Sequence, residues 1–257
     1  MSRGRGGSKC QGWVEWLARL SSSRAAPREV HTAPDTLSAI ATPRRRDGQQ
    51  RRRELCDAAI QVLAEHGSHG LSHPRVDRQA GVPNGTTSYY YRTRAALLRG
   101  VAERVVEMDT ANLRSVTEEP TTTDSPFGRI AQLVMMQGDG AGLMLNKARH
   151  ELLLASTRDP ALAEVYQDFV PRIIAMSRDA IAQILPPAAS SDASLLDAQS
   201  TAVLTFIEGV YGRLLVGDRT ISSAQELGRL LGAIVRAVSV EYGDATGKRA
   251  GRRAQRG

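Results

Sequence analysis

Residues 72–94 read SHPRVDRQAGVPNGTTSYYYRTR, two short helical patterns separated by a tight turn. Ser72 offers a side-chain oxygen to the first free N–H groups of a helix, and Pro74 has the fixed φ that a first helical turn tolerates. Gly81 supplies the backbone freedom needed to end that helix and turn sharply. The spacing therefore predicts a helix-turn-helix over about residues 72–91.

The second helix of this motif carries short or rigid side chains with hydroxyl tips. Asn84 is expected to cap it. In a helix-turn-helix the second helix lies in the DNA major groove, where Asn bonds adenine, Thr contacts the thymine methyl, and Tyr and Arg donate to phosphates. One stripe of the helix is expected to read DNA and the other to pack. The two stripes are Asn84, Thr87, Ser88 and Tyr91, and Thr86 and Tyr90.

The stretch AGVPNGTTSYYYRTRAALL, residues 80–98, resembles the signature of the tetracycline-repressor (TetR) family. The similarity extends over about residues 49–107, and the rest of the chain agrees in helical character and length. Asp77 departs from the pattern, because a small packing residue is usual there. The resemblance implies that the second helix is the recognition helix, with Asn84, Thr86, Ser88, Tyr90 and Arg94 at bases or phosphates. The predicted DNA-binding set is Ser72, Pro74, Arg75, Asn84, Gly85, Thr86, Thr87, Ser88, Tyr90, Arg92 and Arg94.

Positive charge is concentrated towards the two ends of the chain. The net charge is +3 over residues 1–43, +6 over 44–99, −6 over 100–243 and +4 over 244–257. This distribution is expected when one end of a molecule meets a polyanion. The hydrophobic content of 41% in 257 residues is enough to bury a sizeable core.

The pattern of apolar residues predicts an all-α fold in two parts. Residues 49–108 form a three-helix DNA-binding unit, and residues 109–243 form a larger helical regulatory and dimerisation domain. Residues 1–48 are read as a disordered basic arm, which either contacts phosphates through its Arg cluster or is a solvated tail. Residues 244–257 are read as a basic disordered tail. No apolar run is long enough for a signal peptide or a membrane span, so a cytoplasmic protein is expected.

Two regular apolar stripes near the C-terminus are interpreted as a dimer interface. Core-facing packing is the alternative. Small residues beside the stripes, Gly209, Gly212, Gly228 and Gly232, favour close approach of helices in a two-fold four-helix arrangement, and the family resemblance implies the same. The predicted interface is Val203, Ile207, Val210, Leu214, Leu227, Leu231, Ile234 and Val238.

An effector pocket is expected among the helices of residues 100–243. Candidate lining residues are Met144, His150, Phe169 and Met176, although core packing explains each equally well. No nucleophile–base pair, carboxylate pair or metal-ligand spacing emerges, so no catalytic residue, metal or cofactor is predicted.

Together these patterns predict a sequence-specific DNA-binding transcriptional regulator. We expect a ligand-responsive repressor that binds a palindromic operator in double-stranded DNA as a homodimer and responds to an unknown small-molecule effector, with no membrane partner. The alternative is a non-specific nucleic-acid-binding helical protein driven by its Arg-rich arms.

Overall fold

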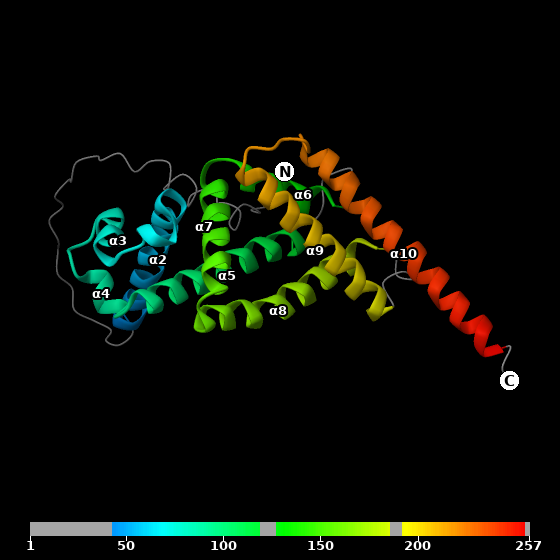
Figure 1. The fold of residues 1–257 in the computed structure, drawn as a ribbon, viewed down its shortest axis with the longest axis horizontal. Coiled ribbons are helices and arrows are strands. Elements are labelled where there is room, and N and C mark those ends of the chain that lie inside the picture. The colour runs from blue at the N-terminus through cyan, green and yellow to red at the C-terminus, as the bar shows by residue number, and fades with distance from the viewer. Residues whose placement is uncertain (1–42, 119–126, 186–191, 255–257) are drawn as a thin grey trace, which may run out of the picture.

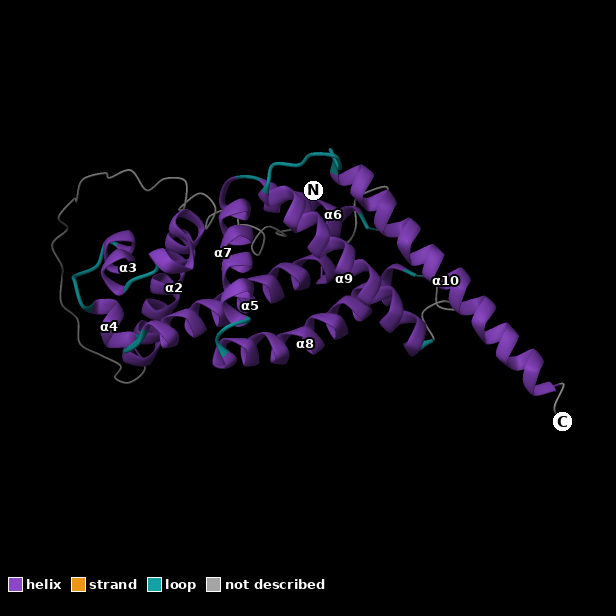
Figure 2. Ribbon diagram, in the orientation of Figure 1, coloured by secondary structure: helices purple, strands orange, loops and turns teal. Residues whose placement is uncertain are grey.

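A computed structural model describes residues 43–118, 127–185 and 192–254, and within these ranges the chain is helical with no β-strand (Figures 1 and 2). The predicted all-α fold is confirmed. The elements in chain order are α2 (Pro43–Gly70), α3 (His73–Ala80), α4 (Thr86–Tyr90), α5 (Arg94–Glu118), α6 (Gly128–Met135), the 3-10 helix η1 (Met136–Gly138), α7 (Gly140–Ser156), α8 (Pro160–Ile184), α9 (Ala193–Leu215) and α10 (Ala224–Ala254).

Helices α2, α3 and α4 and the start of α5 form one end of an elongated molecule (Figure 1). Their apolar residues recur at helical spacing, and Leu55, Leu63, Val76 and Val101 are completely buried in a common core. Gly67 interrupts α2 with a φ of 67°, an angle that glycine adopts without steric cost. The backbone therefore changes direction there before α3 begins.

Both terminal helices extend further than the sequence predicts. α2 begins at Pro43, so residues 43–48 are helical rather than part of a disordered arm. α10 continues to Ala254, so residues 244–254 are helical rather than a disordered tail. The physical reason is that a packed helix propagates into its flanks. Arg44, Arg45 and Arg46 at one end, and the Arg and Ala residues of 244–254 at the other, are good helix formers, although both segments are polar. The remainder of the predicted arm, residues 1–42, lies outside the described residues.

A second core lies among α6, α9, α10 and the end of α8. It corrects the predicted dimer interface, because six of the eight predicted residues are at most 8% exposed and lie in this core of a single chain. Ile234 packs against the same core, and Val238 is half-buried. The apolar stripes of α9 and α10 face each other within one chain, which is the core-facing alternative. The six buried residues are Val203, Ile207, Val210, Leu214, Leu227 and Leu231.

Helix α7 joins the two cores. It crosses α5 and packs against α2 (Figure 1). Its Glu151 accepts a hydrogen bond from the backbone N–H of Ser68, at 2.7 Å, just after the break in α2. Two residues earlier, the buried Arg149 forms two hydrogen bonds of 2.6 and 3.1 Å with the carboxylate of Asp109 on α5. The guanidinium carbon of Arg149 lies 4.9 Å from the ring centre of Tyr211 on α9.

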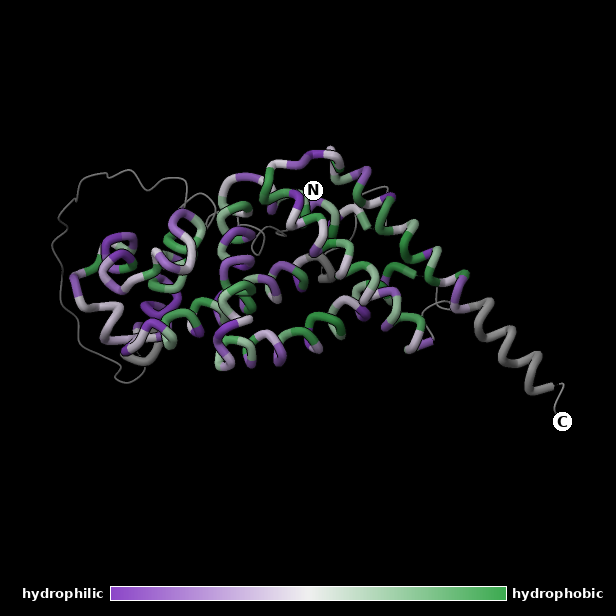
Figure 3. Tube along the Cα trace, viewed as in Figure 1, coloured by the Kyte–Doolittle hydropathy of each residue, from purple (hydrophilic) through white to green (hydrophobic). Residues whose placement is uncertain are grey.

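Hydrophobic and hydrophilic residues alternate along most of the described helices (Figure 3). Most of the large hydrophobic residues are buried between helices. This is the pattern of amphipathic helices around shared cores. Within the described ranges, no helix combines the length and the apolar character needed to cross a membrane.

Candidate DNA interface

Two glycines with positive φ shape the turn between α3 and α4. Gly81 has a φ of 64°, and its N–H donates to the carbonyl of Arg78 at 3.2 Å, which ends α3 where the sequence predicts. Gly85 has a φ of 91° and directly precedes α4. Because glycine adopts such angles without steric cost, the chain reverses direction within a few residues.

The helix caps differ from the prediction at both Ser72 and Asn84. Ser72 occupies the N-cap of α3, but its side chain makes no capping hydrogen bond, and its carbonyl instead accepts from the N–H groups of Arg75 and Val76. Asn84 lies exposed in the turn, and Gly85 takes the N-cap position of α4. The free N–H groups at the start of α4 therefore need a hydrogen-bond acceptor from outside that helix.

That acceptor is the carboxylate of Asp77, which lies on α3 and is 1% exposed. Its Oδ2 accepts from the N–H of Gly85 at 2.8 Å, and its Oδ1 accepts from the N–H and the hydroxyl of Thr87 at 2.7 and 2.5 Å. Burial alone raises the pKa of Asp77, but the hydrogen bonds from Thr87 and Gly85 lower it below its usual value. An ionised carboxylate therefore caps the second helix of the motif.

The contacts of Asp77 decide which face of α4 points inward. Thr87 is completely buried and Tyr91, four residues on, is 8% exposed. Thr87 is thus a packing residue, and its predicted contact with DNA is wrong. Of the first predicted stripe, Thr87 and Tyr91 face inward while Asn84 and Ser88 remain exposed. Asn84 and Tyr91 lie outside the five-residue helix α4, so the four residues do not share one face.

The outward face of α4 is formed by Ser88 and Tyr89, and Arg92, two residues after the helix, is exposed beside it. Tyr89 is 80% exposed, the most exposed aromatic side chain on this helix, and it is absent from the predicted DNA-binding set. Its ring packs edge-on against Tyr90, with ring centres 5.1 Å apart. Helical periodicity contains the missed signal for this helix, because the burial of Thr87 turns positions 88 and 89 away from the core.

The other predicted DNA-binding residues fall into three groups. Pro74 and Arg75 are exposed at the start of α3, and Gly85 is exposed beside α4. Thr86 is partly exposed and its hydroxyl donates to the carbonyl of Pro83 at 2.6 Å. The guanidinium of Arg94 donates to the carbonyls of Ser68 and Leu71, so it braces the loop between α2 and α3.

Tyr90 and Tyr91 attach α4 to the first helix of the unit. The guanidinium carbon of Arg52 lies 5.4 Å from both ring centres, and Arg52 also donates to the carbonyl of Tyr90 at 3.1 Å. The hydroxyl of Tyr91 lies 3.1 Å from the sulfur of the buried Cys56. His73 Nε2 donates to the carbonyl of Tyr91 at 2.6 Å. These contacts fix the angle at which α4 leaves the core.

We expect Gly100→Ala to destabilise the protein, although alanine is the better helix former. A Cβ at this position would lie 2.5 Å from a ring carbon of Tyr91, which the buried surroundings hold in place. Overpacking of this kind costs about 1–3 kcal/mol, more than the roughly 1 kcal/mol that helix propensity returns. Thermal unfolding checks this, with Gly48→Ala as the control because nothing lies within 4 Å of its added Cβ. A higher melting temperature for Gly100→Ala would contradict the prediction.

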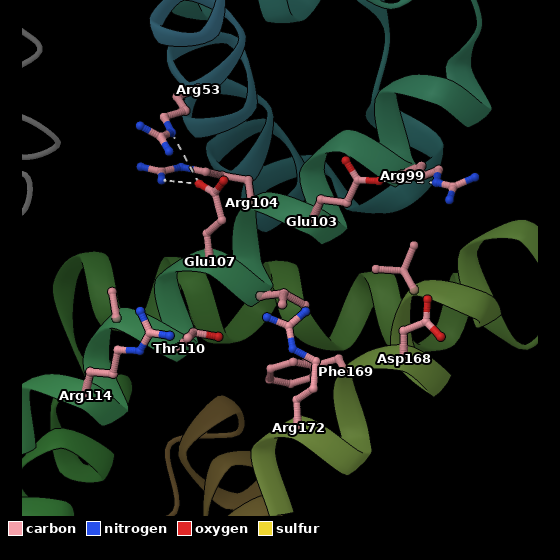
Figure 4. Close-up of a pocket in the computed structure, with 13 residues that line it drawn as sticks. Arg53, Arg99, Glu103, Arg104, Glu107, Thr110, Arg114, Asp168, Phe169 and Arg172 are labelled. Carbon is pink, nitrogen blue, oxygen red and sulfur yellow. Dashed lines mark hydrogen bonds and ion pairs between the residues drawn. The ribbon is translucent and has the colours of Figure 1, made fainter. Parts of the chain in front are cut away.

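Of the four predicted effector residues, only Phe169 lines the groove of about 650 Å³ that runs between α2, α5 and α8 (Figure 4). Met144 and Met176 are partly buried outside it, and Nδ1 of His150 lies 3.0 Å from the carbonyl of Asn146, one turn earlier on α7. The four residues lie on two helices, α7 and α8, and this groove does not bring them together.

The fold and the surface of α4 define a helix-turn-helix DNA-binding protein. A scan against protein-family models gives no match. The chain is 25% identical over 183 residues to the HTH-type transcriptional regulator BetI of Serratia proteamaculans, covering 69% of this chain and 87% of BetI.

Solved structures agree with this classification. A TetR-family member from Streptomyces coelicolor A3 is 27% identical and superimposes with a TM-score of 0.52, over 72% of this chain and 98% of that one. The multidrug binding protein EbrR in complex with ethidium is 26% identical, with a TM-score of 0.50, over 72% of this chain and 98% of that one. The chain thus resembles the TetR-family transcriptional regulators in fold and, more distantly, in sequence. It is a DNA-binding regulator, in keeping with a non-enzymatic function.

Proposed function

We propose that the protein is a ligand-responsive repressor that binds a roughly palindromic operator as a homodimer. The observation that carries this proposal is the outward face of α4. Ser88 and Tyr89 are exposed on it, Arg92 is exposed just after it, and the buried carboxylate of Asp77 fixes the helix start. A capped, rigidly attached helix at the tip of the molecule is the geometry that base reading requires.

The chemistry of this face suits the major groove. The hydroxyl of Ser88 donates or accepts at a base edge, and the Tyr89 ring and hydroxyl contact bases or phosphates. Arg92 and Arg75 flank the helix and pair with phosphates, as their exposure allows. The net charge of +6 over residues 44–99 draws this end towards DNA.

A homodimer is supported by the outer face of α9 and α10, in place of the buried stripes. On α10, Leu230, Ala233, Ala237 and Val240 are exposed at spacings of three and four residues, so they form one small and apolar stripe. Val240 is 65% exposed, and a Cβ added at Gly209 or Gly212 of α9 would meet nothing within 4 Å. Such a surface permits the close approach of two further helices from a second copy.

The response to a ligand is supported by the relation to EbrR, a multidrug binding protein seen with ethidium. Two recognition helices dock only when they are about 34 Å apart, one helical turn of DNA. An effector can prefer the dimer in which this separation is different. It then lowers the affinity for the operator by at most the ratio of its affinities for the two dimer conformations. Helix α5, which starts at α4 and ends among the regulatory helices, is the element that changes this separation.

The test is binding of the purified protein to its own upstream DNA at near-physiological salt, measured by fluorescence anisotropy. Tyr89→Ala is expected to weaken specific binding at least about tenfold, because each of two half-sites loses a contact. Tyr89→Phe, which keeps the ring, is the matched control. The side chain is 80% exposed, so both variants should melt with the wild type. Sedimentation of the complex should give two chains per full operator.

The alternative of a binder driven by its arginine-rich arm predicts a different pattern. A truncation that starts at Gln49, and so removes Arg44, Arg45 and Arg46, would then abolish binding, and Tyr89→Ala would leave it intact. Operator and scrambled DNA would lose affinity in parallel as salt rises. That combination would overturn the proposed function.

A further inference from the structure

The groove between α2, α5 and α8 contains an unusual concentration of arginine. Five of its thirteen lining residues are arginines and three are acidic (Figure 4). Its volume of about 650 Å³ lies within the range of small-molecule sites, roughly 300–1,000 Å³. The arginines are Arg53, Arg99, Arg104, Arg114 and Arg172, and the acids are Glu103, Glu107 and Asp168.

Three of these arginines are already neutralised by acids of the same chain. Arg99 pairs with Glu103 at 3.3 Å. Arg104 pairs with Asp57 at 2.8 Å, and it shares Glu107 with Arg53 at distances of 3.0 and 3.3 Å. Figure 4 marks with dashed lines those of the pairs whose two members line the groove. They hold the groove walls in position but leave little net charge there.

Arg172 is different. It lies on α8, is exposed, and forms no ion pair with any of the described residues. Figure 4 shows its side chain directed from α8 into the groove, towards the wall formed by α5. Phe169 precedes it by three residues and so occupies the same face of α8. Asp168 also lines the groove, and its carboxylate favours a cation where Arg172 favours an anion. These two side chains therefore compete to set the charge of the ligand that binds.

We propose that this groove binds a planar aromatic anion, with its carboxylate or phosphate on Arg172 and its ring against Phe169. A guanidinium offers paired donors that match either acid group. Arg53, Arg99 and Arg104 are neutralised by acids, so Arg172 is the lining arginine on which an acid group is expected to bind. Val106 and Val165 add apolar surface beside the ring, and Thr110 adds a hydroxyl within the site.

The site also has a consequence for regulation, which rests on the proposed function. Arg53 lies on the first helix of the DNA-binding unit, whereas Phe169 and Arg172 lie on α8, so the shape of the groove depends on how these two parts are placed. A ligand that prefers one placement changes operator affinity. Operator DNA must then change ligand affinity by the same factor.

The experiment compares four probes that share one ring system. They are 2-naphthoate, 2-naphthyl phosphate, the neutral 2-naphthamide and the cationic 2-naphthylmethylammonium, titrated into the full chain by calorimetry without DNA. We expect both anions to bind more tightly than the amide by at least about threefold, and the cation to bind most weakly. The stronger of the two anions identifies the acid group that the groove prefers. An equal or higher affinity for the cation would assign the site to Asp168 and overturn the proposal.

Variants locate the binding site. Arg172→Gln should remove the preference for anions over the amide, and Phe169→Leu should weaken all four probes together. Arg158→Gln is the matched control, because Arg158 is exposed just before α8 and does not line the groove. Unchanged anion binding by Arg172→Gln, or no binding of either anion at millimolar concentration, would also overturn the proposal.

These titrations contain no DNA, so they remain informative even if the proposed repressor function fails. Conversely, operator binding is measured without any probe, and its loss in Tyr89→Ala does not depend on the groove. Adding 2-naphthoate to the operator titration then tests the coupling itself, and a shift in wild type that disappears in Arg172→Gln is the expected result.

Discussion

Asp77→Ala is expected to lower the free energy of unfolding by about 2–4 kcal/mol and to remove specific DNA binding. The substitution leaves the N–H groups of Gly85 and Thr87 and the Thr87 hydroxyl without their acceptor, at a site where the carboxylate is 1% exposed. Urea unfolding and operator titration on the same samples measure the two effects. Asp77→Asn, which keeps one acceptor oxygen, should lie between wild type and alanine.

The pH dependence of stability provides a second test of the same carboxylate. The pKa of Asp77 is lowered in the folded state, so the ionised form stabilises the fold above the unfolded pKa of about 3.9. This contribution is lost as the pH falls through the lower folded value. The difference in stability between wild type and Asp77→Asn should therefore be constant near neutral pH and shrink below about pH 4. A difference that grows in acid would contradict an ionised cap.

Arg149→Leu is expected to cost about 3–5 kcal/mol, because it leaves the carboxylate of Asp109 without its partner between α5 and α7. Burial alone lowers the pKa of Arg149, but the adjacent Asp109 more than offsets this and raises it. The arginine is therefore charged, and its guanidinium lies 2.6 Å from the carboxylate of Asp109.

The double variant Arg149→Leu/Asp109→Leu distinguishes a broken pair from lost packing. Replacing both charges by apolar groups is often close to neutral, so the second substitution should recover most of the lost stability. Thermal unfolding of the two single variants and the double variant completes the cycle. A double variant that is less stable than either single variant would show that the packing of Arg149 against Tyr211, rather than its charge, dominates.

The parts of the fold that depend on local sequence are the parts that could be predicted. Gly81 ends α3 and Gly67 breaks α2 because a single residue with positive φ is enough to do so. The buried positions of α5, such as Leu97, Val101 and Val105, follow from periodicity alone. The helix-turn-helix was predictable for the same reason, since all its parts lie within about twenty consecutive residues.

The errors concern groups that meet only in three dimensions. The cap of α4 comes from Asp77, ten residues before Thr87, and no capping pattern places an acid there. Periodicity shows which face of α9 and α10 is apolar but not whether the partner is the same chain, so core residues such as Val203 and Leu231 were assigned to a dimer. The groove needs the relative placement of α2, α5 and α8, which one sequence does not contain.

The core of the DNA-binding end is completed by residues from far along the chain. Leu145, Ala148 and Leu152 of α7 and Leu162, near the start of α8, are buried in the same cluster as the residues of α2 and α5. A chimaera that transferred residues 43–108 onto another regulator would have to supply equivalent apolar side chains from its new host. Residues 43–108 therefore cannot be transferred as an independent domain. Changes in DNA preference are better introduced by substitutions at positions 88, 89 and 92.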